Sequence, residues 1–128
     1  GTGIAHSIGH ALGSLGHVPH GLAVAVGLAA ALPWNVAGAP DSFAVAGATL
    51  GVGVDAVPDR YAELLAAASL GVAVRRVGPI DVDPDRLAAA MADDANQPML
   101  RNNCREADEL DRHALAAATT QIWNRVAG

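Results

Sequence analysis

The apolar run from Gly21 to Trp34 constrains the fold of this chain more than any other feature. It contains no charged side chain, and a helix that is apolar on every side is normally buried among other helices. Pro19 suits the first turn of such a helix, because proline has a preset φ and lacks the amide that would be unpaired there. We therefore expect a central core helix from about residue 19 to Leu32, with Pro33 as its stop.

The same run has neither the length of a membrane helix nor the form of a secretory signal. It is shorter than the ~20 apolar residues that cross a bilayer, and it includes two glycines. No charged n-region and cleavage site precede it. A single cysteine, Cys104, excludes an internal disulfide and fits a reducing compartment. We expect a cytoplasmic protein without a membrane partner.

Charge and composition narrow the fold and the partners further. The formal net charge is −5, and no basic stripe or aromatic platform is present, which argues against nucleic-acid binding. Hydrophobic residues make up 52% of the chain, yet aromatic residues only 3%, and alanine, the best helix former, is abundant. This composition favours closely packed helices over a sheet, so we predict one all-α domain, a helical bundle, over residues 1–128.

Six helices are predicted from apolar spacing and from cap residues. Polar residues fill 95–105, which we expect to be a loop, and 72–77 could hold a short strand-like segment. Asp83 and Asp85 are expected near the positive end of the fifth helix, where acidic residues are favourable, and Gly71 is expected to end the fourth. The expected helices cover about residues 3–15, 19–32, 41–50, 58–71, 83–91 and 108–126.

Four of the five histidines lie within residues 6–20. His6 and His10 are four residues apart, so on a helix both imidazoles share one face. His20 follows on a Pro-His-Gly turn, and imidazole is the commonest metal ligand. We favour a metal site over the alternative of solvated polar residues on a helix surface. We expect His17 to be a solvated loop residue and His113 to lie on the surface.

His6, His10 and His20 and the residues around them are similar to a known family of proteins. The stretch from Gly3 to Gly13, with its His-x-x-x-His, then Val18-Pro-His20-Gly21 and Asn35, resembles the iron-containing (group III) alcohol dehydrogenases. The likeness is closest over residues 3–35 and looser over 43–115. It implies the C-terminal, metal-binding helical domain of that fold, which it shares with dehydroquinate synthase-like proteins.

The resemblance also implies roles for individual residues. His6 and His20 would be metal ligands for Fe²⁺, or for Zn²⁺, and His10 would lie in the cleft and move the alcohol proton. The substrate would be a small alcohol or aldehyde, and NAD or NADP would be held mainly by a separate N-terminal nucleotide-binding domain. That domain is an expected partner, self-association into a homo-oligomer is an expected assembly, and we expect residues 1–128 alone to be catalytically inactive.

The chain departs from the family pattern in three places. It has no Asp-x-x-x-His pair to complete the metal site, no glycine-rich pyrophosphate-binding turn, and Asn103-Cys104-Arg105 where the family often has Asn-Pro-Arg. Two alternatives therefore stay open. One is a maleylacetate reductase of the same family, although Ser7, Gly9 and Gly21 differ from its usual motif. The other is a non-catalytic helical module that binds a metal or a protein partner.

Overall fold

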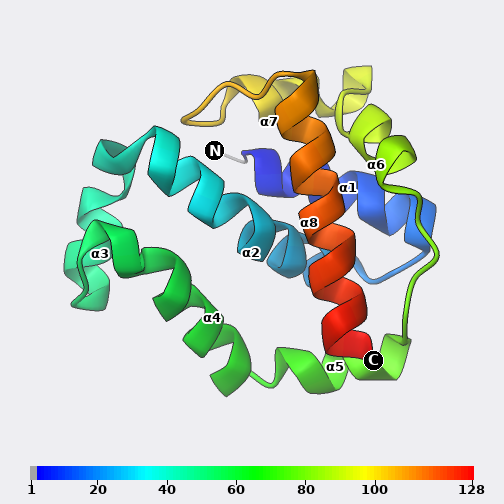
Figure 1. Ribbon diagram of the computed structural model, residues 1–128, viewed down its shortest axis with the longest axis horizontal. Coiled ribbons are helices and arrows are strands. Elements are labelled where there is room, and N and C mark those ends of the chain that lie inside the picture. The colour runs from blue at the N-terminus through cyan, green and yellow to red at the C-terminus, as the bar shows by residue number, and fades with distance from the viewer. Residues whose placement is uncertain (1–2) are drawn as a thin grey trace.

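The computed structural model describes residues 3–128, and within that range the chain is built from helices without a β-strand (Figure 1). The prediction of an all-α fold is therefore confirmed. Short 3₁₀ turns, η1 (Pro40–Phe43), η2 (Val54–Ala56) and η3 (Asp94–Asn96), lead into three of the helices. The α-helices are α1 (Ile4–Gly16), α2 (His20–Gly38), α3 (Ala44–Leu50), α4 (Val57–Ala67), α5 (Leu70–Val77), α6 (Pro84–Met91), α7 (Gln97–Arg101) and α8 (Glu109–Ala127).

Helices α1 and α2 form a tightly packed hairpin, in which glycines allow the two backbones to approach. A Cβ on Gly9 would overlap Val24 Cγ2 and would lie 3.0 Å from the Val24 backbone nitrogen. A Cβ on Gly27 would lie 3.0 Å from Ile8 Cγ2. The short connection between the helices begins at His17, which adopts the left-handed conformation with φ 52°.

The main core lies where α6 and α8 pack against this hairpin. Figure 1 shows α8 crossing α2, and the contacts between these helices are extensive. Trp123 of α8 is fully buried, and its indole Nε1 donates a hydrogen bond of 2.9 Å to the Gly78 carbonyl. This bond ties α8 to the turn that follows α5. The largest side chains buried in this core include Ile4, Ile8, Leu12, Leu87, Met91 and Trp123.

Helices α3, α4 and α5 form a peripheral arm, residues 44–77, that leaves the hairpin and returns towards the end of α8 (Figure 1). A small second core joins the arm to α2 through Leu32, Val36 and Val57. The Tyr61 hydroxyl also donates a 3.0 Å hydrogen bond to the Ala25 carbonyl of α2. The arm is thus attached mainly to α2, and its last helix, α5, also packs against α8.

The predicted end of the central helix is wrong. Pro33 lies inside α2, which continues to Gly38. A residue that is distant in the sequence contacts this last part of α2. The Arg105 guanidinium lies 4.2 Å from the centre of the Trp34 ring and donates a 2.6 Å hydrogen bond to the Trp34 carbonyl. These contacts offset the amide that Pro33 lacks.

Because α2 is longer than expected, the argument from length against a membrane helix is also wrong. By length and composition, α2 is the one helix within residues 3–128 that could cross a bilayer. Inside this fold, 39% of its most apolar window is buried. Core helices of soluble proteins and signal sequences meet the same criteria, so the absence of a membrane partner stays a prediction.

Residues 70–77 are helical, which corrects both the strand-like segment and the predicted end of the fourth helix. Helix α4 ends at Ala67, the chain turns at Ser69 with φ 60°, and Gly71 lies within α5. Helical spacing places Val74 in the core, where it is fully buried, and leaves both Arg75 and Arg76 exposed in the last turn. Positive charge is favourable at that end of a helix.

Two more boundaries differ from the prediction, whereas the starts of α6 and α8 agree with it. Residues 95–105 are not a plain loop, because they contain part of η3 and all of α7. Residues 40–43 form η1, so that α3 begins only at Ala44 and has no side-chain cap. Asp83 accepts a hydrogen bond from the Asp85 amide at the start of α6. Asp108 and Asp111 form a capping box at the start of α8.

Candidate metal centre

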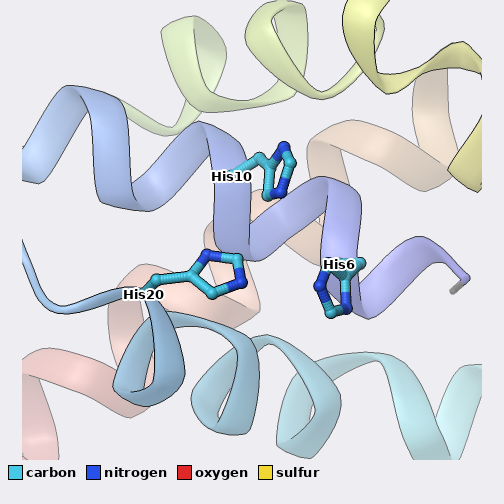
Figure 2. A group of neighbouring side chains, drawn as sticks. All are labelled: His6, His10 and His20. Atoms are coloured by element: carbon cyan, nitrogen blue, oxygen red, sulfur yellow. The ribbon is translucent and has the colours of Figure 1, made fainter.

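The structure brings His6, His10 and His20 together on one face of the α1–α2 hairpin (Figure 2). His6 and His10 project from successive turns of α1. His20 is the first residue of α2, immediately after Pro19. The hairpin therefore places the start of its second helix beside the histidine face of its first. We call these three residues the histidine cluster.

The geometry of the histidine cluster suits a shared ligand. The ring centroids lie 5.6 Å apart for His6 and His10, 5.2 Å for His6 and His20, and 5.1 Å for His10 and His20. One nitrogen from each ring lies within 4.8 Å of the others. Two nitrogens bound to one metal at about 2.0–2.1 Å are roughly 3–4 Å apart. Small side-chain rotations would therefore bring the imidazoles to one ion.

Electrostatics favour the neutral form of His6, which is the form that binds a metal. Partial burial lowers the pKa of His6 from its usual 6.5, because the charged ring loses hydration. Positive charge on His20 or His10 would repel an imidazolium at His6 and lowers its pKa further. The lone pair of His6 is therefore free at neutral pH.

The histidine cluster lies on an accessible face. His6 is half-buried, whereas His10 and His20 are exposed. Within residues 3–128 this group contains three imidazoles and no carboxylate. An ion held here would have open positions for an external ligand, as a catalytic site requires and a closed structural site does not.

The other two histidines lie elsewhere. His17 is exposed at the end of α1, as expected for a loop residue. His113 lies on α8 with part of its ring exposed, and its Nδ1 is 2.9 Å from a carboxylate oxygen of Asp85. This pair connects the surfaces of α8 and α6. Neither histidine belongs to the histidine cluster.

Two hollows of the surface are lined by residues outside the histidine cluster. One, of about 430 Å³, lies between α2, α4, α5 and α8 and is mainly apolar, with Tyr61 and Arg125 among its lining residues. The other, of about 600 Å³, lies between α7 and α8 and includes Arg101 and Arg112. The candidate metal chemistry is therefore separate from both hollows.

Sequence reasoning missed the part that Asn103 plays near this site. Its side chain bonds both the backbone at the start of α1 and the Asn35 side chain on α2. Asn35 could have been singled out in the sequence, because it is a polar residue directly after an apolar run and is one of the residues of the family resemblance. Asn103 was noted only within a segment expected to be a loop and as part of the Asn103-Cys104-Arg105 departure from the family pattern, not as a contact of the hairpin.

Comparisons with protein-family models, with curated proteins and with solved structures find no match to this chain. The resemblance to the iron-containing alcohol dehydrogenases therefore rests on the histidine spacing and the residues around it.

Proposed function

We propose that this chain is the metal-binding helical domain of an iron-containing, NAD(P)-dependent alcohol dehydrogenase. The observation that carries the proposal is the convergence of His6, His10 and His20, with one nitrogen of each within 4.8 Å of the others. The spacing of these histidines is the part of the sequence that resembles the family most closely. The proposal thus joins a sequence motif to a geometry that suits a metal.

His6 and His20 would hold the ion, Fe²⁺ or Zn²⁺, since imidazole suits several first-row metals. Such an ion, when bound, acts as a Lewis acid on an alcohol or aldehyde oxygen. His10 is exposed and lies beside both ligands, so its ring can accept a proton at the site and release it to water. NAD or NADP would be held mainly by a separate nucleotide-binding domain.

One observation favours a second candidate, a non-catalytic metal-binding module. The three imidazoles are nearly equidistant, and the group includes no carboxylate within the described part of the chain. In such a module His10 would be a third ligand and not a proton carrier. The effect of removing His10 therefore separates the two candidates.

The direct test is metal binding by the purified chain, measured with Zn²⁺ by calorimetry and with Co²⁺ by visible absorption. With two protein ligands of four, we expect weak binding that dialysis against a chelator reverses. His6→Ala and His20→Ala should each abolish it, and His10→Ala should leave it close to wild type. His17→Asn is the matched control, because asparagine tolerates the left-handed conformation at that position.

The outcomes discriminate clearly. Failure of the wild-type chain to bind either metal, or wild-type affinity in His6→Ala and His20→Ala, would contradict the proposal. Loss of binding in His10→Ala to the same degree as in the other two would favour the three-ligand module. In a complete enzyme, His10→Ala should retain metal yet lower turnover by about 10²–10⁴-fold. That defect should be milder at high pH, where hydroxide can replace the histidine.

A further inference from the structure

Helix α1 begins without a cap of its own. Its N-cap residue is Gly3, which has no side chain to accept a hydrogen bond from the first amides of the helix. The Ile4 amide instead donates a 3.2 Å hydrogen bond to Oδ1 of Asn103, a residue 99 positions away. The side chain of Ile4 is buried, so this end of the helix lies against the fold.

The same Asn103 side chain also reaches α2. Its Nδ2 donates a 2.7 Å hydrogen bond to Oδ1 of Asn35, which is 5% exposed, and a 2.8 Å hydrogen bond to the Arg105 carbonyl. The carboxamide thus uses its oxygen and both of its N–H groups. One side chain joins the first turn of α1, the last turn of α2 and the segment after α7, which Figure 1 shows near the start of α1.

Neighbouring residues hold Asn103 in this position. A Cβ on Gly3 would lie 2.8 Å from Asn103 Oδ1, so glycine is the residue that allows the close approach. Two residues along the chain, the Arg105 guanidinium stacks on Trp34 and bonds the Trp34 carbonyl. The loop that carries Asn103 is therefore itself attached to α2.

We propose that Asn103 is a positioning residue for the candidate metal centre, setting the separation of His6 from His20. His6 lies in the first turn of α1, where its amide bonds the Gly3 carbonyl next to the Ile4 contact. His20 begins α2, and Asn103 attaches the first turn of α1 to the same helix fifteen residues further along, at Asn35. This inference rests on the proposed function only where metal affinity is concerned, because the spacing of the two rings can be measured without metal.

The experiment compares the wild-type chain with Asn103→Ala, Asn103→Asp and Gly3→Ala, and uses Asn102→Ala, the exposed neighbouring asparagine, as the matched control. Three quantities are measured: Co²⁺ affinity, nuclear Overhauser effects between the His6 and His20 ring protons in the metal-free chain, and exchange of the Ile4 amide. Asn103→Asp keeps an acceptor for the Ile4 amide, and the Asn35 carboxamide can turn over to donate to it, but the hydrogen bond to the Arg105 carbonyl is lost.

Asn103 contacts none of the rings directly, so we expect Asn103→Ala to weaken Co²⁺ binding by no more than about tenfold, the lower end of what loss of a direct outer-shell partner costs. The variant should also lose the ring-to-ring effects and speed Ile4 exchange. Asn103→Asp should recover each of the three in part, because only the bond to the Arg105 carbonyl stays lost, and Asn102→Ala should change none. If Asn103→Ala does not fold, Gly3→Ala decides, because its methyl group displaces the Asn103 oxygen and should give the same losses.

Ring-to-ring effects of wild-type strength in the decisive variant would overturn the inference, whatever the metal does. The inference would also be overturned if Asn103→Asp slows exchange of the Ile4 amide again but does not restore the ring-to-ring effects even in part. A wild-type chain that binds no Co²⁺ would contradict the proposed function alone, since the metal-free measurements still decide the role of Asn103.

Discussion

The α1–α2 hairpin and the peripheral arm are both helical, but their neighbours cover them very differently. In α1, six of thirteen residues are buried. In the arm, α3, α4 and α5 each bury a single residue, Gly47, Val57 and Val74 respectively. The arm also exposes large apolar side chains, among them Val45 at 79% and Val72 at 43%.

This difference indicates where the positions of side chains are fixed by packing. The histidine cluster lies on the hairpin, where the two backbones pack closely at Gly9 and Gly27. The arm contacts α2 chiefly through a small core and the Tyr61 hydrogen bond. We therefore expect the arm to tolerate changes that the hairpin does not, and to open more readily than the rest of the molecule.

The largest contrast should come from removing apolar side chains. Ile8 is fully buried between α1 and α2, so Ile8→Ala should lower the free energy of unfolding by about 2–5 kcal/mol. Val45→Ala in the arm should change it by less than about 0.5 kcal/mol, because this side chain is mostly exposed. Urea denaturation followed by circular dichroism measures both. Similar losses in the two variants would show that the arm is packed as firmly as the hairpin.

A glycine-to-alanine substitution should lower stability in the hairpin and raise it in the arm. Gly9→Ala places a Cβ against Val24 and its backbone, and we expect a loss of about 1–3 kcal/mol that exceeds the gain in helix propensity. Gly71→Ala in α5 meets only the flexible end of Arg75, at 3.1 Å, and should gain about 0.5–1 kcal/mol. Thermal unfolding of both variants checks the signs. A Gly9→Ala protein as stable as Gly71→Ala would refute the close packing of the hairpin.

The fold class and the central helix were predictable from the sequence, because helical spacing and an apolar run are local signals. The end of α2 was not. Pro33 predicts a stop, whereas the contacts that extend the helix come from Arg105, about seventy positions later. Residues 72–77 alternate weakly like a strand, and only the buried position of Val74 against the core selects the helix.

In the candidate site, too, some features could be predicted from local sequence and others could not. The shared face of His6 and His10 follows from their spacing on one helix, and the Pro-His-Gly turn indicates where His20 would return. The tie through Asn103 could not be predicted, because it joins Ile4 to a residue 99 positions away in the sequence, and local sequence patterns do not indicate such distant contacts. Which two of the three histidines bind a metal rests on the family resemblance, since the ring separations are similar.

A smaller effect should follow from cutting the polar link between the arm and the hairpin. Burial raises the pKa of Tyr61 above its usual 10.0, so its hydroxyl stays protonated and donates to the Ala25 carbonyl. Tyr61→Phe should lower the free energy of unfolding by about 0.5–1.5 kcal/mol. Thr49→Val is the control, because the Thr49 hydroxyl bonds Val45 within the exposed α3 and should matter less. Amide exchange in α4 should rise in Tyr61→Phe; equal exchange in wild type and variant would mean that the apolar contacts alone hold the arm.

The smallest predicted effect is a dependence of stability on pH that arises in the hairpin and not in the arm. The pKa of His6 is lowered from 6.5 in the folded chain, mainly by burial and then by His20 and His10. As pH falls through 6.5, the unfolded chain takes up a proton at His6 before the folded chain does, so the folded state loses stability. The loss should grow until the folded pKa is passed and then level off, and stability should be constant well above pH 6.5.

Urea denaturation midpoints of wild type and His6→Gln should be measured from about pH 8 to about pH 5, a range that spans the reference pKa of 6.5. Below pH 6.5 the wild-type midpoint should fall more steeply with decreasing pH than the His6→Gln midpoint. The contribution of Asp111, whose pKa is lowered from 3.8 chiefly by the Asp108 backbone hydrogen bond, is lost only at more acid pH and does not interfere. His17→Gln should keep the wild-type slope; if it flattens the curve while His6→Gln does not, the proton is taken up outside the histidine cluster.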